Sequence, residues 1–140
     1  MAPALLALAV SLTVQTTLQS FEGVWVATHA GTTFARLELR VVDGKLEGKI
    51  GLANIHVDAN GVVDRVTDAP RELKPIFDTS LKSSTLAFAS KDQHDTDRFE
   101  VTLKGSDAEL HFVLSDLDRK SLAAEGVPVP KPIRLTKLRR

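Results

Sequence analysis

Hydrophobic and polar residues alternate with a period of two in several segments of the chain, which is the pattern of a strand with one buried and one solvated face. Leu37 and Leu39, for example, alternate with Glu38 and Arg40. The clearest segments are residues 34–42, 45–51, 98–104 and 109–114, and helical spacing fits none of them as well. The sequence therefore predicts a largely antiparallel β protein.

Turn-forming residues separate these segments. Asp43-Gly44 and Asn60-Gly61 each lie between two apolar runs and are typical of two-residue hairpin turns, in which φ is positive. Gly105-Ser106-Asp107 links a further pair of runs. With the weaker runs included, we expect eight or nine strands: residues 21–29, 33–42, 45–52, 54–58, 62–67, 84–90, 98–104, 109–115 and 132–137.

Two segments break the alternation. Residues 68–83 contain two prolines and read as a long connection with room for a short edge strand. Residues 115–126 predict a short helix, with Ser115 or Asp116 as its N-cap and Gly126 as its stop. The proline-rich run that follows blocks a helix and delivers the last strand in an extended form.

These elements predict an all-β fold, an antiparallel up-and-down β-barrel of eight or nine strands with one short helix before the last strand. The alternative is a β-sandwich, which requires more long crossing connections. The chain has no cysteine, so no disulfide staples it. A closed barrel leaves no unpaired sheet edge and suits such a chain.

The first twenty residues carry no charged side chain. The apolar run Ala4 to Val14 has 11 residues, within the roughly 7–15 of a signal-peptide core and short of the roughly 20 needed to span a bilayer. We therefore expect a signal peptide at 1–20, cleaved near Ser20, and a single barrel domain at 21–140. The product would be periplasmic or extracellular, without a transmembrane anchor. The alternative is an N-terminal strand or helix that stays with the fold.

Charge and composition exclude several classes of function. The 18 basic and 18 acidic residues balance, which argues against a nucleic-acid partner because such a protein needs a basic face. The absence of cysteine excludes zinc–thiolate sites, iron–sulfur clusters and thiol nucleophiles. No nucleophile motif or glycine-rich phosphate loop occurs, and we expect no cofactor. The last ten residues, 131–140, hold five basic and no acidic side chains, which fits either an acidic partner surface or a solubilising end.

Short motifs carry a resemblance to a known family. Gly23-Val24-Trp25 resembles the Gly-x-Trp start of lipocalins and related calycin barrels, and Thr96-Asp97-Arg98-Phe99 resembles their Thr-Asp-aromatic element with an arginine inserted. Arg134 corresponds to their late basic residue. The resemblance implies that the tryptophan, the acidic turn and this arginine form a structural cluster at the closed end of the barrel.

Two further motifs are similar to those of small exported bacterial barrel modules. These are the hairpin Asp43 to Ile50, which reads Asp-Gly-Lys-Leu-x-Gly-x-Ile, and the final Pro132-Ile133-Arg134-Leu135. The resemblance implies a barrel that holds a small apolar ligand, or an accessory module without one. If the chain is a calycin, its aromatic side chains point inward, and the candidate ligand-binding residues are Trp25, Phe34, Phe88, Phe99 and Phe112.

Polar residues provide an alternative, an enzyme of the hydrolase or isomerase type that acts at the barrel mouth. Its candidate catalytic residues are His29, His94, Asp95 and Asp97, which would have to converge at one opening. Residues 92–97 also fit a solvated hairpin loop. The histidines lack metal-ligand spacing, so we expect no metal site. A third alternative is a protein-interaction domain, which would show an exposed apolar patch.

Overall fold

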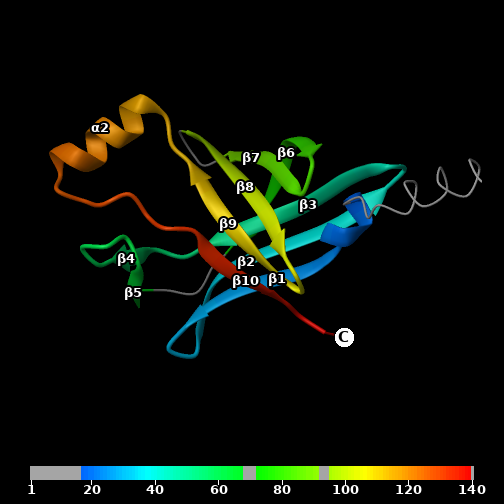
Figure 1. Cartoon of the computed structure of the whole chain (residues 1–140), viewed down its shortest axis with the longest axis horizontal. Coiled ribbons are helices and arrows are strands. Elements are labelled where there is room, and N and C mark those ends of the chain that lie inside the picture. Colours follow the sequence, from blue (N-terminus) through cyan, green and yellow to red (C-terminus); the bar gives the residue numbers. More distant parts are fainter. Residues whose placement is uncertain (1–16, 68–71, 92–94, 140) are drawn as a thin grey trace, which may run out of the picture.

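The computed structural model describes residues 17–67, 72–91 and 95–139, and its main body is a closed antiparallel barrel of eight strands, as the sequence predicts (Figure 1). Around the barrel the order is β1-β10-β9-β8-β7-β6-β3-β2. The barrel strands are β1 (Gly23–His29), β2 (Thr32–Val42), β3 (Lys45–Leu52), β6 (Lys74–Lys82), β7 (Thr85–Lys91), β8 (Thr96–Lys104), β9 (Asp107–Val113) and β10 (Ile133–Lys137).

Two well-paired blocks of strands make up the barrel. Strands β1, β2 and β3 form one meander, and β6 to β10 form the other. The seam between β3 and β6 has two register pairs, Lys49 with Pro75 and Ile50 with Lys74. The seam between β1 and β10 also has two, Trp25 with Lys137 and Val26 with Thr136. The β1–β10 seam continues past Lys137 toward the closed end through a hydrogen bond from the Leu138 amide to the Val24 carbonyl at 2.8 Å.

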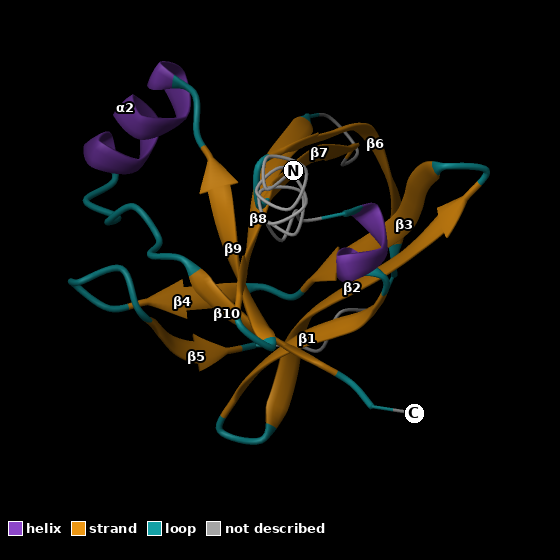
Figure 2. Cartoon of the chain, turned by 45° about the vertical axis from the view of Figure 1, so that its right-hand side comes forward, coloured by secondary structure: helices purple, strands orange, loops and turns teal. Residues whose placement is uncertain are grey.

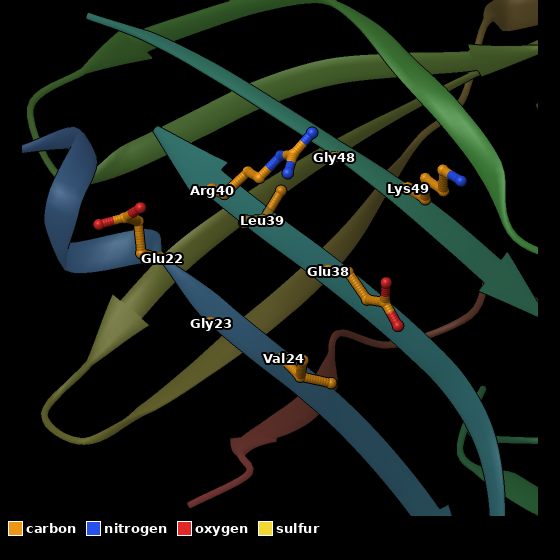
Figure 3. Close-up of a pocket in the computed structure, with 8 residues that line it drawn as sticks. All are labelled: Glu22, Gly23, Val24, Glu38, Leu39, Arg40, Gly48 and Lys49. Atoms are coloured by element: carbon orange, nitrogen blue, oxygen red, sulfur yellow. The ribbon is translucent and has the colours of Figure 1, made fainter. Parts of the chain in front are cut away.

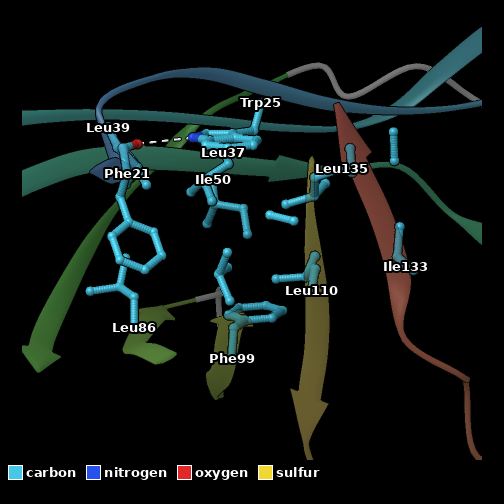
Figure 4. Close-up of a cluster of buried hydrophobic side chains, with 14 of the residues drawn as sticks. Phe21, Trp25, Leu37, Leu39, Ile50, Leu86, Phe99, Leu110, Ile133 and Leu135 are labelled. Carbon is cyan, nitrogen blue, oxygen red and sulfur yellow. Dashed lines mark hydrogen bonds between the residues drawn. The ribbon is translucent and has the colours of Figure 1, made fainter. Parts of the chain in front are cut away.

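Apolar side chains from the inward face of each meander fill the barrel. Trp25, Leu37 and Ile50 are register partners across β1, β2 and β3, and each is at most 5% exposed. Figure 4 shows Phe99, Leu110 and Leu135 facing them from the other block. This interior follows directly from the period-two alternation read in the sequence.

One end of the barrel, here called the closed end, is covered by the 3-10 helix η1 (Leu18–Phe21). The Phe21 side chain is fully buried, and the Trp25 indole donates a hydrogen bond from Nε1 to the Phe21 carbonyl at 2.9 Å (Figure 4). Leu18 packs against the same core. The helix η1 therefore straddles the predicted domain boundary at residue 20, whereas residues 1–16 of the expected signal peptide lie outside the described part of the chain.

The opposite end, here called the open end, carries the two longest connections. The first holds a separate two-stranded hairpin, β4 (Ile55–Val57) and β5 (Val63–Val66). The second holds α2 (Asp116–Ala124), which has no buried residue and stands away from the barrel (Figure 2). Ser115 caps α2 and forms a capping box with Asp118, as expected from the sequence.

Two expectations about the strands differ from the structure. Residues 74–82, predicted as part of a connection with room for only a short edge strand, form the nine-residue barrel strand β6, whose alternation is interrupted by a bulge near Asp78, where φ is +53°. The predicted strands 54–58 and 62–67 do exist, but they pair with each other outside the barrel wall. Local alternation identifies a strand but not its partner, which explains both differences.

The structural cluster implied by the family resemblance also differs. Lys137, not Arg134, covers the tryptophan, with its Nζ 5.5 Å from the centre of the Trp25 ring. Arg134 instead donates from Nε to Asp107 Oδ2 at 2.8 Å. Thr96 begins β8 at the open end, whereas Trp25 lies near the closed end. The fold is compatible with a lipocalin-like barrel, but these residues do not form the cluster of that family.

Candidate functional site

A cleft of about 270 Å³ lies at the open end, where β1 and β10 diverge. The seam is paired at Val26 and Thr136 and has no further register pair toward the open end, so Ala27 to His29 of β1 separate from Ile133 and Arg134 of β10. The tip of the β4–β5 hairpin covers the gap. The lining residues are Ala27, Thr28, His29, Phe34, Gly61, Val62, Val63, Lys131, Pro132, Ile133 and Arg134.

Main-chain contacts hold the hairpin tip against the chain that leads into β10, and the two segments run side by side in both overall views (Figure 1, Figure 2). The Lys131 amide donates to the Gly61 carbonyl at 2.9 Å. Gly61 has φ +82°, and a Cβ at this position would lie 2.4 Å from the Val129 carbonyl oxygen. Only glycine fits such a backbone without strain. The Asp58 carboxylate further orders the tip by accepting from the Asn60 and Val62 amides.

A second anchor joins the hairpin to β1. His29 Nε2 lies 3.1 Å from the Asp64 carbonyl oxygen, and because a carbonyl only accepts, this nitrogen carries the proton. On the other side of the same residue, His56 Nδ1 lies 2.6 Å from Asp64 Oδ1. Two imidazoles thus converge on Asp64. An imidazole held by a carboxylate is a usual arrangement for a general base, but both side chains are about half exposed, 58% for His56 and 43% for Asp64.

The lining of the cleft is apolar with basic groups at its rim. Phe34 and Ile133, 4% and 5% exposed, form its floor, and Val62, 47% exposed, lies on the hairpin side. No acidic residue lines it. Arg134 is neutralised by Asp107, whereas Lys131 has no ion pair within residues 17–67, 72–91 and 95–139. The cleft therefore combines an apolar wall with one uncompensated positive charge.

The predicted ligand-binding aromatics separate into two groups. Phe34 lines the cleft. Trp25, Phe88 and Phe99 belong to the filled core and are 2–3% exposed. The ring centroids of Phe88 and Phe99 are 5.6 Å apart, and those of Phe99 and Phe112 are 5.8 Å apart. These contacts are those of rings that pack against one another across β7, β8 and β9.

Of the predicted polar residues that the structure describes, His29 ends β1, Asp97 lies on β8, and Asp95 directly precedes β8. His29 is at the cleft, bonded to Asp64. Asp97 lies on β8 opposite Ser90, and in the barrel order β9 and β10 stand between β8 and β1. Asp95 is exposed just before β8, and His94 lies outside the described residues. Two strands thus stand between His29 and Asp97 in the barrel order, and among the described residues no three His, Asp or Glu side chains gather as a metal site.

A larger groove, about 590 Å³, lies on the outer face of β1, β2 and β3 (Figure 3). Gly23 and Gly48, both register partners of Leu39, are among the residues that line it. Both of its carboxylates are engaged: Glu22 accepts from the Val41 amide, and Glu38 pairs with Arg36 at 2.7 Å. We regard it as a solvated sheet face and prefer the smaller cleft, because two carboxylates, Glu22 and Glu38, line the groove, whereas the cleft has a largely apolar lining and no carboxylate.

Sequence reasoning found His29 and Phe34 but missed the other members of this site. Gly61, Val62, Asp64 and Lys131 come from two connections that meet only in the folded chain. The Asn60-Gly61 dipeptide predicted a turn and the proline run at 127–132 predicted an extended segment, but neither pattern predicted that the two segments contact each other. In the part of the chain that the structure describes, no helix has the length and apolar character needed to cross a bilayer. Comparisons with protein-family models, with curated proteins and with solved structures find no significant match to this chain.

Proposed function

We propose that this protein is an exported, lipocalin-like binding protein for a small apolar ligand, and that the ligand occupies the cleft between β1, β10 and the β4–β5 hairpin. The observation that supports this most is an apolar, open-ended cleft over an otherwise filled barrel. Ligand sites are typically concave, mostly apolar and rimmed by a few polar groups.

The size of the cleft restricts the ligand. About 270 Å³ corresponds to roughly nine water-sized volumes at about 30 Å³ each. A linear alcohol such as 1-octanol is about that size. At about 0.5 kcal/mol per heavy atom, such a ligand would bind with a free energy of roughly 4–5 kcal/mol, a Kd of the order of 1 mM or slightly below.

Val62 and Val113 allow a matched test of this proposal. Val62 lines the cleft and is 47% exposed, whereas Val113 ends β9, is 43% exposed and does not line the cleft. We expect Val62→Asn to weaken 1-octanol binding at least fivefold in a calorimetric titration and Val113→Asn to leave it within twofold. Absence of binding to the wild-type protein, or equal effects of both variants, would refute the proposed site.

The alternative of a protein-interaction domain has one observation in its favour. The helix α2 has no buried residue, and its Leu117 is 73% exposed. A helix of 9 residues without a packed face is marginally stable by itself, because most helical stability in proteins comes from tertiary packing, so a partner that covers Leu117 would stabilise it. If Leu117→Glu changes the sedimentation behaviour of the purified protein while 1-octanol binding is unaffected, the helix serves association rather than ligand binding.

A further inference from the structure

We infer that the cleft selects an apolar ligand with an anionic head group, such as a short-chain carboxylate. This inference rests on the proposed function and specifies the chemical class of its ligand. The three titratable side chains that line the cleft are His29, Lys131 and Arg134, all of them basic, and no carboxylate lines it.

Lys131 is the residue that would recognise the anion. The Arg134 guanidinium is held by Asp107 through both Nε and a terminal nitrogen, so its charge is matched on the outer face of the barrel. His29 uses its Nε2 proton on the Asp64 carbonyl. Lys131 is exposed, forms no ion pair within the described residues, and its ammonium is free to approach a ligand at the rim.

The backbone around Lys131 fixes where its side chain starts. Its amide donates to the Gly61 carbonyl at 2.9 Å, and Pro132 and Ile133 follow directly as part of the cleft wall. The base of the side chain therefore lies between the hairpin tip and the apolar wall. A carboxylate at the rim would meet the ammonium while its alkyl chain contacts Val62 and Ile133.

The carboxylates of the β4–β5 hairpin do not oppose this arrangement, because both have partners of their own. The Asp64 carboxylate accepts from His56 Nδ1 at 2.6 Å, and its residue presents the main-chain carbonyl, not the carboxylate, to His29. Asp58 is likewise engaged by the amides of the hairpin tip. The electrostatic preference at the rim is thus set by the lysine, and it should weaken with added salt because an exposed charge is screened.

The test compares three ligands with one alkyl chain: octanoate, 1-octanol and octylammonium, titrated at pH 7 and low ionic strength. We expect octanoate to bind about five- to tenfold more tightly than 1-octanol, and octylammonium to bind more weakly than either. In Lys131→Gln the ratio of the octanoate and 1-octanol affinities should fall to about one, while 1-octanol binding stays within twofold. Lys120→Gln, an exposed lysine on α2, is the matched control and should keep the wild-type ratio.

The outcomes separate the two proposals. If 1-octanol binds and octanoate binds no better, the cleft does not select anions and this inference is wrong, although the proposed function stands. If the preference for octanoate survives in Lys131→Gln, recognition by the lysine is wrong. If none of the three ligands binds the wild-type protein, the proposed function is wrong and the inference fails with it.

Discussion

Phe21 closes one end of the barrel, and its replacement by alanine gives the sharpest stability prediction. The side chain is 0% exposed and is among the largest fully buried groups of the described chain. The turn η1 that carries it is attached to the barrel through the bond from Trp25 Nε1 to the Phe21 carbonyl. The substitution removes a whole ring from a site enclosed by other buried side chains, which include Trp25 and Leu86.

The magnitude follows from burial. A buried phenylalanine truncated to alanine costs about 3–5 kcal/mol, the sum of lost apolar burial and the cavity left behind. For a domain of this size, 1 kcal/mol corresponds to a shift in Tm of roughly 3–6 °C. We therefore expect Tm to fall by roughly 9–30 °C.

The assay is urea unfolding followed by the fluorescence of Trp25, the single tryptophan of the chain, which is 2% exposed in the folded state. The matched control is Phe77→Ala, because Phe77 is 40% exposed and its loss leaves no enclosed cavity. We expect the control to cost roughly 1–2 kcal/mol. If Phe21→Ala costs less than about 1 kcal/mol, or no more than the control, then Phe21 does not plug the closed end and the reasoning is refuted.

Three further predictions concern the open end and the seams. Gly61→Ala should lower the free energy of unfolding more than Gly31→Ala. Both residues have φ near +82°, but only at Gly61 would a Cβ meet the Val129 carbonyl. Urea unfolding of both variants measures the difference, and equal losses of unfolding free energy would contradict the contact. Ser115→Ala should reduce the helical circular dichroism signal of α2, since an N-cap stabilises a helix by about 0.5–2 kcal/mol. The Tm of the protein should stay within roughly 2 °C of the wild-type value because α2 has no buried residue. A large fall in Tm would show that α2 is packed against the barrel. In native-state hydrogen exchange, amides along the β1–β10 seam should exchange faster than amides between β7 and β8. The seam has two register pairs, whereas β7 and β8 share seven. The reverse order of exchange rates would contradict the description of the barrel as two blocks of strands.

Local signals in the sequence explain what could be predicted. Alternation at Leu37 and Leu39 gave β2 its buried face, and Ser115 with Gly126 marked the ends of α2. Such features depend on residues a few positions apart. For this reason the fold class and most strands are confirmed by the structure.

Features set by distant residues could not be predicted in the same way. Where β6 lies, only a short edge strand was expected, because Pro75 and the bulge at Asp78 interrupt its alternation, and its place in the barrel depends on pairing with β7. The cleft depends on where the β1–β10 seam stops pairing and on the contact of Gly61 with Lys131, which are seventy positions apart in the chain. No local sequence pattern predicts the end of the β1–β10 pairing or the contact between Gly61 and Lys131.

Methyl NMR of the wild-type protein titrated with octanoate would show where the ligand binds. We expect chemical-shift changes at the methyl groups of Val62, Val63 and Ile133, with little change at Leu37 and Leu110 in the filled core. Changes centred on Leu37 and Leu110 would place the ligand inside the barrel and contradict the cleft, and a titration without any shift would contradict ligand binding itself.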